Sequence, residues 1–267
     1  MQKTALAILI TLITFSLYAQ LPDKGLEEMY DYQVKGMGEF MARFNGKEHL
    51  KMKRVFSDSL SQRAKDIMSV CNYEISETTP NFRHIFEKFI KTIEHDSIML
   101  NFSDSTWFAA ATFNIQYQKK NIKVNLLLTP HEARPNRFCW ALVDVGGKDI
   151  NKLADTTKWV GISPTDNELD FIELAGKSKT QRGNFPGFRK PGQDIDYLSA
   201  FVALVQAGVV SIDNCEKITY YFLNVPDFVF TVDNFIRASS NSGWLISSIA
   251  LIAEEEKQPF LKEMFNY

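Results

Sequence analysis

The feature that most constrains this chain is the stretch from 194 to 253, in which the spacing of apolar residues changes once. Residues 194–208 carry apolar side chains around most of a helical circumference, and the run that follows alternates apolar with polar residues. A repeat near 3.6 predicts a helix, and a repeat of two predicts half-buried strands. We expect a helix at 194–208 that is buried on several sides, followed by strands at about 216–224, 227–237 and 243–253.

An earlier part of the chain has the same order of elements. An amphipathic helix is predicted at 81–95, and alternating strands at about 106–118, 122–129 and 138–145. Trp140 aligns with Trp244, and the helices and following strands align with Phe89, Ile93, Ile98 and Leu100 against Phe201, Val205, Val210 and Ile212. We interpret this as an internal duplication, with one module at 20–150 and a second at 151–267.

Two more helices are predicted near the start, and one at the end. Apolar residues recur at helical spacing over 24–44 and over 57–71, where Ser57, Asp58 or Ser59 could provide the N-cap. The C-terminal residues include Phe260 and Leu261 and could dock as a short helix. Helices followed by consecutive antiparallel strands predict an α+β fold with helices packed on curved antiparallel sheets.

The first 19 residues have the layout of a secretory signal peptide. Lys3 precedes an apolar run that ends at the small residue Ala19. The alternative is a membrane anchor, but the run is shorter than the ~20 residues that a spanning helix needs. We therefore expect an exported protein, periplasmic or extracellular, with no membrane span after cleavage.

The net charge and the cysteine content bear on the expected partners and disulfides. A formal net charge of −2 does not favour nucleic acid as a partner. The three cysteines are Cys71, Cys139 and Cys215, and the odd count leaves at least one thiol unpaired. A Cys139–Cys215 disulfide is one interpretation; three buried thiols that act as small hydrophobic residues is the one we prefer.

No stretch has the spacing of a known catalytic or metal-binding motif. His49 lies in a basic run that suggests a solvated surface, and His131-Glu132 falls in a predicted hairpin loop. We therefore expect no cofactor and no metal site. The basic segment 176–192 is either an arm that binds an anionic ligand or a surface loop.

The candidate binding residues are polar or aromatic residues in phase with the apolar face of a strand. Asp144 is in phase with Trp140, and Asn234 is in phase with Phe230. A polar group on a core face needs a partner or a ligand. With Tyr220 and Trp244, the predicted pocket lining is Trp140, Asp144, Tyr220, Asn234 and Trp244. The alternative is that Asp144 and Asn234 lie at strand ends and reach water.

Two segments carry a family resemblance. The helix end EFMARFNG and the terminal strand pair FVFTVDNFIR and NSGWLIS resemble those of exported NTF2-like (cystatin-like) proteins of bacterial envelopes. The resemblance implies cone-shaped modules in tandem, each with a pocket between its sheet and its helices. It does not fix a function, because this fold supports enzymes, ligand-binding proteins and interaction modules.

Three functions remain open at this point. The first is a non-catalytic protein that binds a small apolar ligand, a glycan or a partner protein in such a pocket. The second is an isomerase-like or hydrolase-like enzyme in which Asp144 is the base and a tyrosine donates a proton. The third is a structural or interaction module that pairs through its sheet, for instance as a homodimer.

Overall fold

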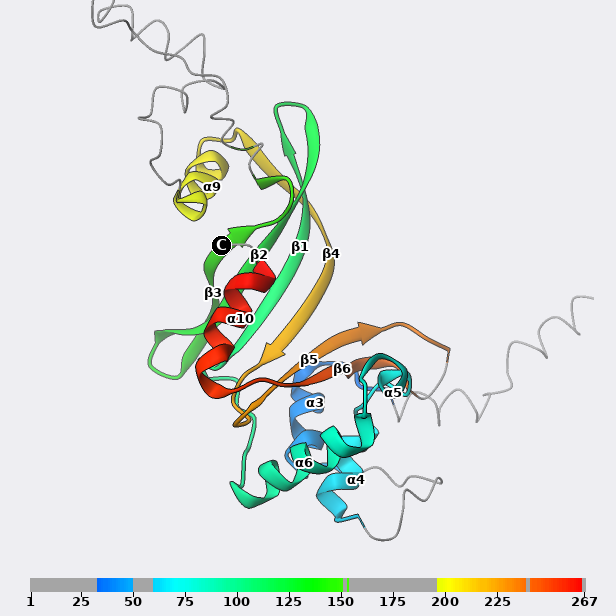
Figure 1. The fold of residues 1–267 in the computed structure, drawn as a ribbon. Helices are drawn as coiled ribbons and strands as arrows, with labels where there is room; N and C mark the ends of the chain where they lie inside the picture. Colours follow the sequence, from blue (N-terminus) through cyan, green and yellow to red (C-terminus); the bar gives the residue numbers. More distant parts are fainter. Residues whose placement is uncertain (1–32, 50–59, 151–152, 154–195, 239–240, 266–267) are drawn as a thin grey trace, which may run out of the picture. The chain divides into compact units, whose positions relative to one another are not determined.

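The computed structural model describes residues 33–49, 60–150, 153, 196–238 and 241–265. These residues form helices and a six-stranded sheet (Figure 1), so the chain has an α+β fold. The helices are α3 (Met37–Phe44), α4 (Gln62–Ser69), α5 (Ile75–Thr78), α6 (Phe82–His95), α9 (Tyr197–Gln206) and α10 (Lys257–Phe265). The strands are β1 (Trp107–Tyr117), β2 (Lys120–Arg134), β3 (Arg137–Gly146), β4 (Val210–Phe222), β5 (Phe228–Phe235) and β6 (Gly243–Leu251).

The strands are arranged in the order β3-β2-β1-β4-β5-β6. β1 pairs antiparallel with β2 and with β4, and β2 pairs antiparallel with β3. Each half of the sequence thus supplies three consecutive strands, and β1 and β4, the first strand of each set, meet in the middle of the sheet (Figure 1). The strands of the two halves therefore form one continuous sheet.

Helices α6 and α9 each pack on strands of the opposite half of the sequence. Phe201 of α9 packs with Ile115 and Val124, which belong to β1 and β2. Phe89 of α6 lies edge-on against Phe228 and Phe230 of β5, with both ring-centroid distances 5.4 Å. The two predicted halves are thus interleaved in space.

The described residues divide into two compact units, and each takes residues from both halves of the sequence. The first unit combines residues up to Pro80 with Asp233–Ser247. In it, Val34 forms a parallel bridge with Gly243, and Cys71 forms one with Ile246. Gly243 has a φ of 92°, and a Cβ atom there would lie 2.0 Å from the carbonyl oxygen of Val34. Only glycine fits this approach of two backbone segments.

Arg237 joins two loops within the first unit. Its guanidinium donates to Asn72 Oδ1 over 2.9 Å and to Glu74 Oε2 over 2.8 Å. The same group lies over the ring of Tyr73 at 4.6 Å and the ring of Phe235 at 4.5 Å. The planar guanidinium forms hydrogen bonds with one set of groups and stacks on two rings, and so holds both loops. A lysine ammonium is not planar and could not replace it.

The second unit covers Asn81–Val232 and Ser248–Tyr267. Leu126 and Leu127 of β2 point to opposite faces of its sheet, because successive strand residues alternate. Leu126 belongs to the cluster that α9 covers, and Leu127 belongs to the cluster that includes Leu261 of α10. The two helices therefore cover opposite faces of the sheet.

Lys257 ties the C-terminal helix to the sheet of the second unit. Its buried ammonium donates to the carbonyl oxygens of Leu223 over 2.6 Å and Val225 over 2.8 Å, and pairs with Glu254 over 2.6 Å. The prediction of a docked C-terminal helix is confirmed. A buried charge of this kind is tolerated because all its donors are engaged.

Several element boundaries differ from the sequence-based ones. α3 begins only at Met37, because the extended Gly36 is its N-cap. The N-cap of α4 is Ser61, whose hydroxyl accepts from the Ala64 N–H, and not one of residues 57–59. β2 continues through Pro130 and His131 to Arg134, so the predicted hairpin loop around His131-Glu132 is wrong. Proline is tolerated there because β2 pairs with β1 only as far as Leu128, so beyond this residue the strand is paired on one side only, with β3.

The helix at 194–208 exists, but its predicted burial on several sides is wrong. α9 has Asp196 as N-cap, and Phe201 is its one buried residue. Val202 remains exposed to solvent. The helix is rich in apolar residues, yet it rests on the sheet along one side only.

The cysteines also correct the sequence interpretation. Cys71 is buried, and burial raises the pKa of its thiol; Cys139 and Cys215 are exposed, so the prediction of three buried thiols is wrong for two of them. Cys139 lies on β3 and Cys215 on β4, with β2 and β1 between them. Three inter-strand spacings amount to ~14 Å, beyond the reach of a disulfide.

The predicted signal peptide at 1–19 and the basic segment 176–192 lie outside the described residues. Within the described residues, none of the helices has the length and hydropathy required to cross a membrane.

Candidate functional site

A ladder of aromatic rings runs across one face of the sheet in the second unit. The strand register places Trp107 of β1 opposite Phe222 of β4, and Pro130 of β2 opposite Trp140 of β3. Consecutive rings lie within 4.8–5.4 Å of one another, centroid to centroid. We call this set the aromatic ladder; its members are Trp140, Trp107, Phe222, Phe230 and Phe89.

The ladder changes character along its length. Phe89, Phe222 and Phe230 are fully buried, and the Phe222 ring stacks on both of its ladder neighbours. At the other end Trp140 is 41% exposed, on the edge strand β3. The half-buried Tyr220 lies beside this exposed end, with its ring 5.9 Å from Trp140 and 25° from parallel. We call Trp140 and Tyr220, supported by the buried Trp107, the aromatic platform.

The local sequence explains why Tyr220 reaches the ladder. Tyr220 is paired with Ala109, whose side chain is only a methyl group. A small residue at that position leaves room above the sheet, so the Tyr220 ring can contact Trp107 at 5.6 Å. Aromatic and β-branched pairs across strands stabilise a sheet, which accounts for the buried part of the ladder.

Two polar groups on the platform are affected by burial. The indole Nε1 of Trp107 is buried without a hydrogen-bond partner, which costs about 1–3 kcal/mol in a folded protein. The pKa of Tyr220 is raised, first by burial and then by the charge of the Cys215 thiolate. Tyr220 is therefore a neutral phenol at neutral pH, able to donate a hydrogen bond.

Asp144 lies away from the platform. A register shift pairs Asp144 with Leu127 and Leu142 with Leu128, which removes the phase relation to Trp140 on which its prediction depended. Its Oδ1 accepts from the Val145 N–H over 2.7 Å, while Oδ2 is buried without a partner. Burial raises the pKa of Asp144, the Val145 bond opposes the rise, and the carboxylate of Asp196 adds to it.

The remaining two predicted residues lie in the first unit. Asn234 is exposed on β5. Trp244 is half-buried on β6, and its backbone N–H donates to Val34 over 2.9 Å. Of the five predicted residues, the structure thus brings together Trp140 and Tyr220.

Sequence reasoning missed two features. Trp107 is central to the platform, although its place on an alternating strand face with two alanines could have drawn attention to it. His49 is not a lone solvated residue, because its Nδ1 lies 2.8 Å from Oδ2 of Asp66. Asp66 is buried and also accepts from Gln62 Nε2 over 2.9 Å. No sequence signal links these residues, since the contact depends on how the chain returns to α4.

Among the described residues, no group of three or more His, Cys, Asp or Glu side chains is placed to hold a metal ion. No family model, no curated protein and no solved structure matches this chain. The function of this chain has to be inferred from the geometry of its own residues.

Proposed function

We propose that this protein is a non-catalytic binding protein that holds a ring-bearing ligand, in particular a glycan, on the aromatic platform. The observation that carries the proposal is the near-parallel arrangement of a partly exposed tryptophan and tyrosine over a buried tryptophan. An aromatic face that is open to solvent binds rings through apolar contact and geometry-dependent stacking.

The distribution of polar tips favours a glycan over a fully apolar ligand. The rings at the buried end of the ladder are phenylalanines, whereas Trp140 and Tyr220 at the exposed end each carry a hydrogen-bonding tip. A sugar ring has an apolar C–H face and a rim of hydroxyl groups, so it matches an aromatic surface with polar tips.

The enzyme alternative has less support. Asp144 and Tyr220 lie on β3 and β4, with two strands between them. Oδ1 of Asp144 accepts from the Val145 N–H and Oδ2 has no hydrogen-bond partner, so this carboxyl is not hydrogen-bonded to the Tyr220 hydroxyl. We therefore place neither residue in a catalytic role.

We also propose that the protein is NTF2-like and exported. The sheet consists of two consecutive three-strand sets that meet at β1 and β4, which is the order expected if one unit had been duplicated. Together with the sequence resemblance, this supports an NTF2-like relationship. We further propose that the first 19 residues direct export, which would bring the platform to extracellular or periplasmic glycans.

The test is a titration of the full chain with a panel of soluble oligosaccharides, followed by calorimetry and tryptophan fluorescence. Trp140→Ala should weaken binding of the best oligosaccharide roughly tenfold or more, because one stacked ring contributes about 1.5 kcal/mol. Ile236→Ala removes a fully exposed apolar side chain in the first unit and should leave the affinity unchanged. Equal binding by wild type and Trp140→Ala would rule out the platform as the site.

A second candidate, self-association through the sheet, is favoured by one observation. β3 is an edge strand, and its exposed apolar residues Phe138, Trp140 and Val143 are of the kind that pairs with another strand. In that case sedimentation would show a concentration-dependent dimer that Phe138→Lys disrupts, and no oligosaccharide would bind.

A further inference from the structure

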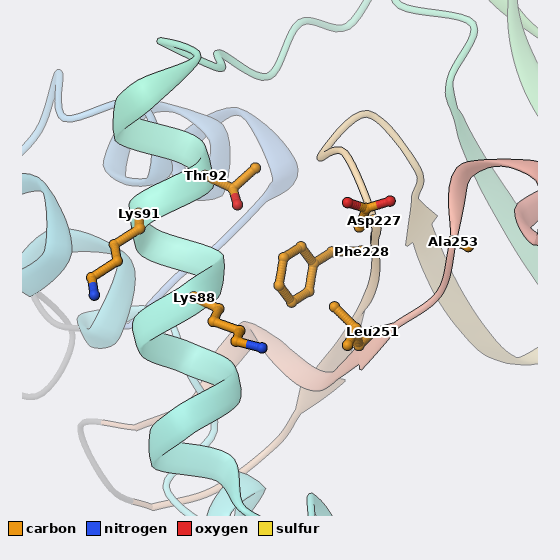
Figure 2. Close-up of a pocket in the computed structure, with 7 residues that line it drawn as sticks. All are labelled: Lys88, Lys91, Thr92, Asp227, Phe228, Leu251 and Ala253. Atoms are coloured by element: carbon orange, nitrogen blue, oxygen red, sulfur yellow. The ribbon is translucent and has the colours of Figure 1, made fainter.

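A hollow in the second unit, separate from the aromatic platform, lies between helix α6 and the ends of strands β5 and β6. Its volume is about 570 Å³, within the range of 300–1,000 Å³ that is typical of small-ligand sites. The lining residues are Lys88, Lys91, Thr92, Asp227, Phe228, Leu251 and Ala253 (Figure 2).

The hollow is lined by two cations, Lys88 and Lys91, and by one anion, Asp227. Neither the ammonium of Lys88 nor the carboxylate of Asp227 has a hydrogen bond or ion pair with any described residue. Figure 2 shows Lys88 reaching from α6 toward Leu251, with the Phe228 ring between α6 and Asp227. Lys91 also lines the hollow, but in Figure 2 its side chain points away from Leu251. The charges of Lys88 and Asp227 therefore lie on different walls of the hollow, each available to a ligand.

The backbone conformation at Asp227 fixes the position of its carboxylate. Its φ is 58°, in the left-handed region that glycine, asparagine and aspartate tolerate better than most residues. The carbonyl of Asp227 is held by the Ile252 N–H over 2.8 Å, which fixes the turn without using the side chain. The hydrogen bond that holds this turn therefore leaves the Asp227 carboxylate free to contact a ligand.

The floor of the hollow is apolar and rigid. The Phe228 ring is buried and packs edge-on against Phe89 at 5.4 Å. Leu251 is an exposed large apolar residue at the rim, and Thr92 adds a half-buried hydroxyl group. A ligand that fits must combine a negative group, a positive group and an apolar part.

We infer that this hollow binds a small zwitterion of the amino-acid class, a free amino acid or short peptide with an apolar side chain. Lys88 would hold the carboxylate, Asp227 the ammonium, and Phe228 with Leu251 the side chain. Lys88 and Asp227 are both exposed, and a ligand that carries only one charge leaves one of them without a partner. Opposite charges on two walls therefore favour a ligand that carries both.

The test is calorimetric titration of the full chain with L-leucine, L-phenylalanine and dileucine, and with two blocked forms, N-acetyl-leucine and leucinamide. The zwitterions should bind, and each blocked form should bind at least tenfold more weakly. Lys88→Met should lower the affinity for leucine and remove the preference for leucine over leucinamide. Asp227→Asn keeps a residue that tolerates the left-handed backbone, and it should remove the preference for leucine over N-acetyl-leucine.

Lys262→Met is the matched control, because Lys262 is exposed on α10, within the same unit. It should leave leucine binding unchanged, as should Trp140→Ala, so that this site and the platform fail or succeed independently. The inference is overturned if no zwitterion binds at millimolar concentration. It is equally overturned if the blocked forms bind as well as leucine, or if both wall variants bind leucine like the wild type.

Discussion

At the scale of single residues, two aspartates show how the environment sets a pKa. Asp144 lies on β3 and Asp196 is the N-cap of α9, and their pKa values shift in opposite directions. Burial raises the pKa of Asp144, whereas hydrogen bonds from Ser199, first its hydroxyl and then its backbone N–H, lower the pKa of the exposed Asp196. A charged aspartate thus destabilises the fold at position 144 and stabilises it, as a helix cap, at position 196.

Replacement of Asp144 by asparagine should raise the melting temperature at neutral pH. A raised folded-state pKa means that, above the ordinary value of 3.8, the folded protein holds a proton that the unfolded chain releases. Stability therefore falls as pH rises through the folded-state pKa, and the charged Asp144 is destabilising at neutral pH. Asparagine keeps the acceptor for Val145, so the gain should disappear below about pH 4 in a series of thermal melts.

For Asp196→Asn we expect a change in melting temperature of the opposite sign. The lowered pKa of Asp196 means that its charged form stabilises the fold above its ordinary pKa and loses this effect as pH falls. Its asparagine variant should melt lower than the wild type at neutral pH. A melting temperature for Asp144→Asn at or below that of the wild type at neutral pH would contradict the role assigned to burial.

At the scale of elements, the close approach of β6 to the N-terminal segment depends on one glycine. The carbonyl of Val34 accepts from the Trp244 N–H over 2.9 Å, and its N–H donates to Ser242 over 3.1 Å. These bonds hold Val34 against β6 beside Gly243, where any Cβ atom would collide with backbone. The sequence marks Gly243 only as a turn residue, because the collision partner is more than two hundred positions away.

Gly243→Ala should lower the free energy of unfolding by about 3 kcal/mol or more, from left-handed strain together with the clash against Val34. Gly208→Ala isolates the strain, because Gly208 has a φ of 66° but nothing lies within 4 Å of a Cβ there. We expect about 1–2 kcal/mol for that control. Urea unfolding of both variants measures the difference, and equal losses would show that β6 can move away from Val34.

At the scale of the whole molecule, the two halves of the sequence are not two separable bodies in the described structure. Strands from both halves share one sheet through β1 and β4, and α6 and α9 pack on strands of the opposite half. Contacts of this kind join residues that are far apart in the chain. They have to form together, because neither half can bury its apolar faces alone.

Fragments 20–150 and 151–267, expressed separately, should therefore each lack cooperative unfolding. When they are expressed together they should form a complex with the circular dichroism spectrum of the whole chain. The measurement is thermal unfolding of each fragment and of the co-purified pair. If fragment 20–150 alone unfolds cooperatively, the first half is a module in its own right and the interleaved packing is not needed for stability.

The sequence alone determined the type and order of most elements, since period 3.6 at 81–95 and period two at 106–117 are local properties of the chain. It also identified Trp140 and Tyr220 as candidate site residues, because each is an aromatic residue with a polar group on a predicted strand. It did not give the place of Asp144, because a bulge of one residue changes the phase of a strand and leaves no mark in the pattern.

Which faces of the elements contact one another could be seen only in the folded chain. The pairing of β1 with β4, the stacking of Trp140 with Tyr220, and the hollow between Lys88 and Asp227 each join residues more than 75 positions apart. Periodicity reports which side of an element is apolar, but not which other element covers it. That choice depends on strand order and register, which are set by the packing of the whole chain at once.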